Sequence, residues 1–242
     1  KQLNVELRSL IDKSAIKGKI STYDLGFKLG PRINAAGRLG RSSFGTELLT
    51  ATDTANADHI ADELDKFNKE RRTIESYVLD SAEKQVTEEK LNKKLLIVYG
   101  EDWHEGVIGI IASRLKDKYH RPCVVITVSK GKAKGSGRSM KGIDLGNLVI
   151  AAKQAGIIDS GGGHSMAAGL SLKEDKIEEL GNFFESQLSS GQSKVVDEKM
   201  IYVDSLISSS GINLEVYDEI EKLGPFGSDN IEPNFVVKSS LL

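Results

Sequence analysis

The sequence predicts an α/β fold, and three observations lead to this prediction. Two almost uninterrupted apolar runs, at 95–99 and 123–128, are typical of strands in a sheet that is covered on both faces. Between them, residues 107–118 have the apolar spacing of a helix. A strand, a helix and a second strand in this order predict a βαβ unit with parallel strands and a right-handed crossover.

Further elements extend this unit in both directions. Upstream, apolar residues between 55 and 91 recur at spacings near 3.6, which predicts one long amphipathic helix capped by Asp53 or Thr54. On this helix Asn68 and Arg71 lie near the apolar stripe, either at its solvent edge or in contact with a ligand. Downstream we expect strands at 132–139 and 167–172 and helices at 145–155 and 177–188.

The character of the chain changes after residue 190. The segment SSGQS at 189–193 has the composition of a linker, and 195–203 contains strand-like residues. A short helix at 214–223, a turn at 224–227 and a strand from Pro233 onward complete the predicted elements. The expected organisation is therefore four segments, at 1–54, 55–92, 93–190 and 191–242.

Composition indicates a cytoplasmic protein without a membrane span. No apolar run approaches the roughly 20 residues that a spanning helix needs. Cys123 is the only cysteine of the 242 residues, so an intramolecular disulfide is excluded and a reducing compartment is favoured. Because Cys123 begins the apolar run CVVITV, we expect a buried, inert thiol.

The net charge argues against a non-specific nucleic-acid binder, but the basic residues are unevenly distributed. The formal net charge is −2 and the pI is about 6.2. A narrow cationic groove on an acidic body would still concentrate an anionic strand locally. The basic residues gather in two segments: Arg32, Arg38 and Arg41, and Lys130, Lys132, Lys134, Arg138 and Lys141.

Three glycine-containing segments are candidates for phosphate contacts. Residues 161–169, GGGHSMAAG, have glycines that can form a cradle of backbone N–H donors, next to His164. Residues 135–139, GSGRS, combine a guanidinium with two hydroxyls that suit a terminal phosphate. Residues 30–38, GPRINAAGR, place two arginines among small residues in a stretch that we expect to be non-helical. The alternatives are ordinary turns and loops with solvated side chains.

These segments, together with WHEGVIGI at 103–110, carry a resemblance because they occur in one order over almost the whole chain. The chain resembles the RecJ single-strand-specific exonucleases of the DHH phosphoesterase superfamily. The resemblance implies a hydrolase that degrades single-stranded DNA from the 5′ end in recombination and repair, with manganese or magnesium. It further implies a DHHA1 substrate-binding domain at 93–190, preceded by a connector helix and followed by the start of an oligonucleotide-binding (OB) barrel.

The partners implied by the resemblance are single-stranded DNA and an N-terminal DHH lobe, with single-strand-binding protein and a RecQ-type helicase as further candidates. The Asp-His-His triplet that names the superfamily is absent, and the four histidines have no adjacent Asp-His or His-His partner. We therefore interpret the chain as the C-terminal part of a longer enzyme. It would supply substrate positioning, bind no metal itself and be inactive alone.

The resemblance and the chemistry together give a set of expected site residues. Ser136, Arg138 and Ser139 are expected to hold the 5′ phosphate. Gly162, Gly163 and His164 are expected to surround the phosphate near the cut, with His164 in a catalytic role. Arg32, Asn34 and Arg38 are expected to guide the strand. The alternative functions are a DHH/DHHA1 phosphodiesterase for short oligonucleotides or cyclic dinucleotides, and a non-catalytic single-strand-binding or protein-docking module.

Overall fold

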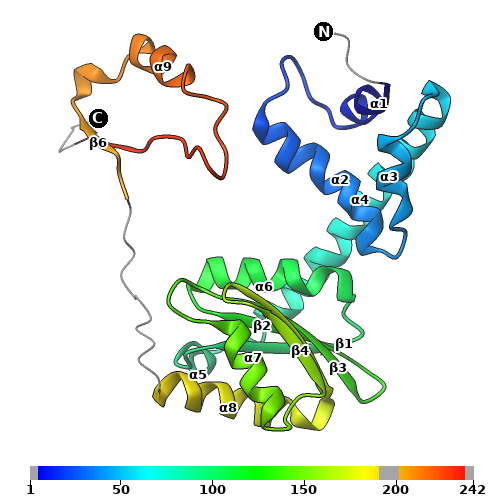
Figure 1. Ribbon diagram of the computed structural model, residues 1–242, viewed down its shortest axis with the longest axis vertical. Helices are drawn as coiled ribbons and strands as arrows, with labels where there is room; N and C mark the ends of the chain where they lie inside the picture. Colours follow the sequence, from blue (N-terminus) through cyan, green and yellow to red (C-terminus); the bar gives the residue numbers. More distant parts are fainter. Residues whose placement is uncertain (1–4, 191–201, 238–242) are drawn as a thin grey trace.

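The computed structural model describes residues 5–190 and 202–237, with side chains from residue 7 onward. The chain begins with a helical bundle, and one long helix leads from it to an α/β domain (Figure 1). The bundle comprises α1 (Val5–Lys13), the π-helix η1 (Asp24–Leu29), α2 (Gly30–Arg38), α3 (Ser43–Leu49) and the first half of α4 (Thr54–Glu83).

The GPRINAAGR segment is helical, so our expectation of a non-helical stretch was wrong. Pro31 lies in the first turn of α2, where a missing N–H costs no hydrogen bond. Ala35 and Ala36 are fully buried, and Ala36 packs in a cluster with Leu10, Leu29 and Leu64. The small residues therefore allow the helices of the bundle to approach closely, rather than leaving room for a ligand.

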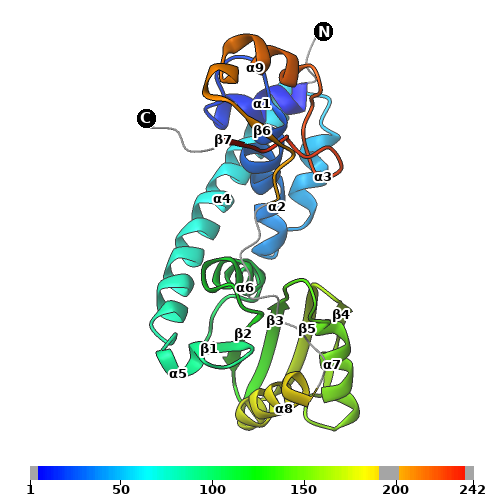
Figure 2. The same cartoon turned by 90° about the vertical axis from the view of Figure 1, so that its left-hand side faces the viewer.

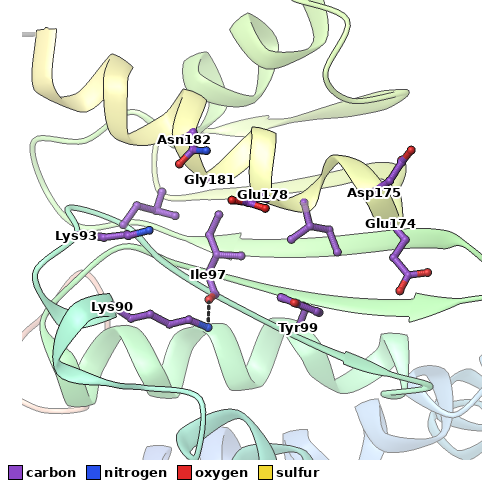
Figure 3. Close-up of a pocket in the computed structure, with 11 residues that line it drawn as sticks. Lys90, Lys93, Ile97, Tyr99, Glu174, Asp175, Glu178, Gly181 and Asn182 are labelled. Atoms are coloured by element: carbon purple, nitrogen blue, oxygen red, sulfur yellow. Dashed lines mark hydrogen bonds between the residues drawn. The ribbon is translucent and has the colours of Figure 1, made fainter.

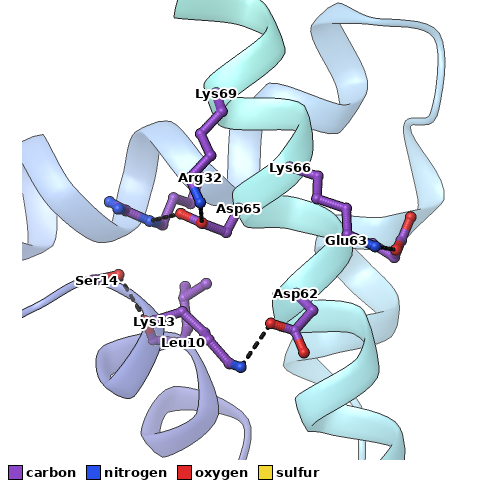
Figure 4. Close-up of polar contacts among 9 residues, drawn as sticks. All are labelled: Leu10, Lys13, Ser14, Arg32, Asp62, Glu63, Asp65, Lys66 and Lys69. Carbon is purple, nitrogen blue, oxygen red and sulfur yellow. Dashed lines mark hydrogen bonds and ion pairs between the residues drawn. The ribbon is translucent and has the colours of Figure 1, made fainter.

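Within the bundle, ion pairs fasten α1 and α2 to α4 (Figure 4). Arg32 Nε lies 2.9 Å from Asp65 Oδ1, and Arg32 Nη1 donates to the Lys28 carbonyl at 2.8 Å. Lys69 reaches the other oxygen of Asp65 at 2.8 Å, and Lys13 Nζ lies 2.6 Å from Asp62. The Arg32–Asp65 pair is largely shielded from solvent, so it fixes α2 against α4.

The connector helix α4 begins where the sequence indicates but ends earlier. Asp53, and not Thr54, is the N-cap, and its side chain accepts from the Asn56 N–H at 2.9 Å. The helix ends at Glu83, and a separate short helix α5 (Glu88–Leu91) follows, so the single helix predicted to residue 91 was wrong at this end. The apolar pattern extends past the end of the helix, because Val86 lies beyond α4 and also packs against the core of the α/β domain.

The α/β domain contains one five-stranded mixed sheet in the order β1-β2-β3-β5-β4. The predicted parallel pairing of β1 with β2 is confirmed, and the remaining neighbours are antiparallel. The strands are β1 (Leu96–Glu101), β2 (Cys123–Ser129), β3 (Lys132–Arg138), β4 (Ser160–His164) and β5 (Ala167–Lys173).

Helices cover the two faces of the sheet unequally (Figure 2). On one face α6 (Glu105–Tyr119) packs over β2 and β3, in a core that it shares with β1 and the end of α4. On the other face α7 (Leu145–Gln154) and α8 (Ile177–Ser190), which follows the short 3₁₀ turn η2 (Glu174–Lys176), enclose the larger core. The first face is consequently left open over β5 and β4.

The triple glycine forms the edge strand β4 and not a loop, which corrects the expectation of a glycine cradle before the strand at 167–172. A Cβ on Gly161 would lie 2.6 Å from Val149 Cγ1, and one on Gly163 would lie 2.3 Å from the Ala167 carbonyl oxygen. The strand can therefore pair with β5 and still pack on α7 because these two positions have no side chains.

The free edge of β1 is blocked by a side chain. Gln85 pairs with the backbone of Tyr99 through both polar atoms of its side-chain amide. Nε2 donates to the Tyr99 carbonyl at 2.6 Å, and Oε1 accepts from the Tyr99 N–H at 3.2 Å. Lys90 Nζ donates to the Ile97 carbonyl at 3.2 Å. These contacts satisfy an edge that could otherwise pair with another chain.

Cys123 is fully buried under α6, as expected, and burial raises the pKa of its thiol to about 12. Only the thiolate is nucleophilic, so at neutral pH a thiol reagent should modify the native protein about a thousandfold more slowly than the unfolded chain. Timed labelling with Ellman's reagent, with and without denaturant, measures this ratio. Rapid labelling of the native protein would show that β2 is not covered as described.

Residues 202–237 contain a small separate sheet. Strand β6 (Ser205–Ile207) pairs in parallel with β7 (Phe235–Val237), and between them lie the 3₁₀ turn η3 (Ser209–Gly211) and α9 (Leu214–Glu221). The predicted helix at 214–223 and the final strand are thus present. Most of the strand predicted at 195–203 lies outside the described residues, and the OB-like start remains a prediction.

Candidate functional site

The strand register brings two of the three phosphate-binding candidates together. Residues that face each other across β3, β5 and β4 point to the same side of the sheet, and alternate residues along each strand do so too. Three parallel rows therefore lie on the open face, each with one residue from each strand. The rows are Arg138–Ala167–His164, Ser136–Gly169–Gly162 and Lys134–Ser171–Ser160.

Glycine makes the centre of this face flat and leaves its backbone accessible. A Cβ on Gly162 would have no atom within 4 Å, and the nearest atom to one on Gly169 would be 3.9 Å away. Gly163 alternates with Gly162 and His164 and so faces the other side of the strand, where a Cβ would overlap the backbone of β5. The result is a floor without side chains, between a guanidinium on one strand and an imidazole two strands away, about 10 Å apart by strand spacing.

Arg138 is held in place on the β3 side of this floor. Its Nη1 donates to the Gly137 carbonyl at 2.8 Å and to Ser136 Oγ at 3.3 Å. Helix α6 reaches this pair at Gly109, where an added Cβ would lie 3.0 Å from Ser136 Oγ and 3.1 Å from Arg138 Nη2. Gly109 therefore allows α6 to support the half-buried guanidinium without displacing it.

His164 ends β4 on the opposite side, where it is exposed. The start of α7 packs against the backbone here: the Leu145 N–H donates to the Ser165 carbonyl at 3.0 Å, and Gly146 approaches the His164 carbonyl. Asp144 caps α7 by accepting from the Asn147 N–H at 2.9 Å. The backbone of His164 is thus fixed while its side chain remains available to a ligand.

Ser139 belongs to the structure of the turn rather than to the open face. It is only 1% exposed, and its hydroxyl donates to the Ile143 carbonyl at 2.8 Å. Its N–H donates to the Met166 carbonyl at 2.9 Å, which ties β3 to the turn before β5. Of the GSGRS segment, Ser136 and Arg138 therefore face the floor.

Two clefts adjoin this face. The one that we call the sheet cleft, of about 330 Å³, lies over the second and third rows and is bordered by Glu105, Ile108, Lys134, Ser136 and Gly169 among others. The one that we call the junction cleft, of about 840 Å³, lies between the end of α2 and the start of α6. It is lined by residues 37–40 and 102–106 and by Thr127, Ser129, Lys132 and Lys134.

Arg38 lines the junction cleft, and Arg32 and Asn34 do not. Arg38 is exposed, and its Nη1 donates to the Gly106 carbonyl at 3.2 Å. Gly106 is required here because a Cβ would lie 2.0 Å from the Arg38 carbonyl oxygen. Arg32 is occupied by Asp65 inside the bundle, whereas Asn34 lies exposed on α2. The structure thus separates the three residues predicted to guide the strand.

His104 and Trp103 have different roles at the start of α6. His104 is the N-cap, and its Nδ1 accepts from the Gly106 N–H at 3.0 Å, which leaves Nε2 directed away from the helix. Trp103 is buried against Gly100 in the core beneath α6. Trp103 therefore has a structural role.

A buried polar network joins α4 to α6. Glu75 is 2% exposed, and Arg71 Nη1 donates to its Oε2 at 2.5 Å. Arg114 of α6 forms an ion pair with the other oxygen of Glu75, and Arg71 Nη2 donates to Asn68 Oδ1 at 3.0 Å. Burial lowers the pKa of the Arg71 guanidinium, an effect that Glu75 opposes. Asn68 and Arg71 are therefore not at the solvent edge of the helix.

A third cleft, of about 520 Å³, lies at the other edge of the sheet between α5, β1 and α8 (Figure 3). Leu95, Ile97 and Ile177 form its apolar floor, with lysines on the α5 side and acidic residues on the α8 side. Burial lowers the pKa of Lys90, which donates to the strand edge here. None of the predicted site residues lines this cleft.

The part of the chain that the structure describes shows no group of residues arranged as a metal centre. Within 5–190 and 202–237, no three residues of the types His, Cys, Asp or Glu are grouped so that they could hold a metal ion. In the same ranges, no helix combines the length and apolarity needed to cross a bilayer. The groups that line the open face are cations, hydroxyls and backbone around a flat floor, and these groups suit the binding of an anion.

Several site features had little or no signal in the sequence. Gly169, Ser171 and Ser160 join the site only through strand register, and Gly109 supports Arg138 from another element. The repeated glycines of WHEGVIGI and GGGHSMAAG were the available signal that close approach was needed. Nothing in the local pattern indicated that Glu75 would pair with Arg114.

Comparison with known proteins places this geometry in a family. Residues 92–190 match the DHHA1 domain. The chain is 36% identical to the "single-stranded-DNA-specific exonuclease RecJ" of Haemophilus influenzae over 90% of this chain and 39% of that protein. It is 33% identical to the protein of the same name from Bacillus subtilis over 93% of this chain and 29% of that protein.

A solved structure shows the same fold. The crystal structure of RecJ from Thermus thermophilus in complex with Mn²⁺ aligns with a TM-score of 0.84 and 29% sequence identity, over 96% of this chain and 34% of that chain. The chain spans roughly two fifths or less of the length of these relatives. By sequence and by fold, it belongs to the RecJ family, and residues 92–190 form its DHHA1 domain.

Proposed function

We propose that this chain is the substrate-binding part of a metal-dependent, single-strand-specific DNA exonuclease that works from the 5′ end in recombination and repair. The observation that carries the proposal is the alignment of Arg138, Ser136, Gly162, Gly169 and His164 on one open sheet face. Arginine beside a hydroxyl binds phosphate oxygens through short, charge-assisted hydrogen bonds. The glycine floor lets a sugar-phosphate backbone approach the sheet closely.

In this proposal each group has a distinct role. Arg138 and Ser136 bind the terminal 5′ phosphate, and the floor with His164 accommodates the next phosphate, near the scissile bond. Arg38, at the edge of the junction cleft, guides the strand. Arg32, Asn34 and Ser139 are omitted from the binding set because of their placements in the structure. The relative from Thermus thermophilus is described in complex with Mn²⁺. We propose that the whole protein uses manganese or magnesium, held by residues that this chain does not supply.

Replacing Arg138 with alanine should weaken binding of 5′-phosphorylated single-stranded DNA by about 10- to 100-fold, the range expected for loss of a hydrogen bond between charged groups. Binding of the same strand with a 5′ hydroxyl should change far less. Fluorescence anisotropy with the two oligonucleotides at low salt measures both constants.

The matched control is Lys153→Ala, which removes one exposed positive charge from α7 on the covered side of the sheet. It should affect both oligonucleotides slightly and equally. Equal losses for both oligonucleotides in Arg138→Ala would rule out Arg138 as the reader of the 5′ end. Absence of binding by the unmodified chain would contradict the proposed function itself.

A further inference from the structure

A single ion pair separates the junction cleft from the sheet cleft. Among the described residues that line the two clefts, Glu105 and Lys134 are the ones that they share. Lys134 Nζ lies 2.8 Å from Glu105 Oε1 and 2.9 Å from Oε2, so the ammonium is bound by both carboxylate oxygens. The pair connects the first turn of α6 to the middle of β3.

The position of Glu105 favours an anion. It is the first residue of α6, a helix of 15 residues, where the helix dipole and the N-terminal amides stabilise negative charge. Lys134 stands in the same row as Ser171 and Ser160, whose hydroxyl oxygens are 2.5 Å apart. Glu105, Lys134 and the two serines line the sheet cleft together, so a phosphodiester in this cleft would meet an ammonium, two hydroxyls and the start of α6.

The ion pair between Lys134 and Glu105 can be broken at a small cost in stability. The side chains of Lys134 and Glu105 are 59% and 58% exposed, and ion pairs at such exposure contribute little to stability. The other negative group that lines the junction cleft is Asp102, which is exposed and not paired with Lys134. A phosphodiester can therefore replace Glu105 as the partner of Lys134 at little cost to the fold.

We propose that Lys134 binds the DNA strand. In the absence of a strand that spans both clefts, Glu105 remains the ion-pair partner of Lys134. A phosphodiester at the boundary then displaces the carboxylate and pairs with Lys134, which joins the two clefts into one groove. This inference rests on the proposed function, single-strand binding, and adds a residue that binds the strand and one that opposes its binding. Glu105 thereby lowers the affinity for strands that reach the boundary between the two clefts.

The test is a double-mutant cycle on the full 242-residue chain. The probe is a 5′-phosphorylated oligothymidylate of about 12 nucleotides, within the range of single-strand site sizes. Glu105→Gln, Lys134→Gln and the double variant are titrated at low salt by fluorescence anisotropy. Asp102→Asn is the control because it removes one negative charge from the same cleft, and asparagine tolerates the left-handed backbone of residue 102, φ 51°.

We expect Glu105→Gln to tighten binding about fivefold, the upper range for releasing an exposed ion pair, and Asp102→Asn to tighten it much less. Lys134→Gln should weaken binding, and adding Glu105→Gln to it should restore no more than the Asp102→Asn effect. An equal gain from Glu105→Gln with and without Lys134 would overturn the inference, because the charge would then act without Lys134. If the unmodified chain did not bind the probe, the proposed function would fall, and this inference with it.

Discussion

Replacement of Glu75 by alanine should lower the free energy of unfolding by about 3–5 kcal/mol, the cost of removing one partner from a buried ion pair. Glu75 is almost completely buried, and it is the carboxylate that compensates Arg71 and Arg114. Arg38 and Arg72 add further positive charge near Arg71. Without Glu75, the buried guanidinium of Arg71 would retain only its neutral hydrogen bond to Asn68.

The measurement is equilibrium urea unfolding, followed by far-ultraviolet circular dichroism, at the same protein concentration for each variant. Asp62→Ala is the matched control because Asp62 lies on the same helix and pairs with Lys13 at the surface. Exposed pairs of this kind contribute little, so we expect a much smaller change. Comparable losses in the two variants would show that the Glu75 network does not hold α4 to α6.

Replacement of Gly163 by alanine should cost about 3 kcal/mol or more, because the new methyl group would overlap backbone. Its Cβ would lie 2.3 Å from the Ala167 carbonyl oxygen and 2.5 Å from Ala168 Cα. Neither atom can rotate away as a side chain could. Strand β4 would have to separate from β5, and the rows that form the site would lose their alignment.

The neighbouring substitution Gly162→Ala should change stability little but weaken DNA binding. A Cβ at Gly162 has no atom within 4 Å, and alanine is less costly than glycine in a strand, so stability should change by less than about 1 kcal/mol. The methyl group would stand on the floor of the proposed phosphate site, where it should weaken binding of 5′-phosphorylated DNA severalfold.

Urea unfolding and the anisotropy titration of both variants together test this pair of predictions. A Gly162→Ala variant as unstable as Gly163→Ala would show that β4 is not oriented as described. A stable Gly162→Ala variant with unchanged DNA affinity would instead remove the glycine floor from the proposed binding surface. The first result would contradict the described orientation of β4, and the second would contradict the proposed phosphate site.

Local patterns in the sequence were sufficient for most elements of the α/β domain. Apolar runs and helical spacing located the strands of the βαβ unit, α6, α7 and α8, because burial on one or both faces leaves a periodic record. Besides the end of the connector helix, two segments were misread, and both are rich in small residues. Glycine and alanine leave no such record, so GPRINAAGR looked like a loop and is α2, and GGGH looked like a turn and is β4.

The sequence by itself determined the α/β class, the connector helix up to the choice between Asp53 and Thr54 as its cap, the buried thiol, and the residue types suited to a phosphate. The tertiary structure alone decided which of these residues share a surface. Strand register places Arg138 opposite Ala167 and Ala167 opposite His164, and a shift of one residue would turn each of them to the other face. Packing likewise decided that Arg32 pairs with Asp65 and that the Ser139 hydroxyl donates to the Ile143 carbonyl in the turn after β3. A side chain's partners depend on how the elements around it pack, which the local sequence does not show.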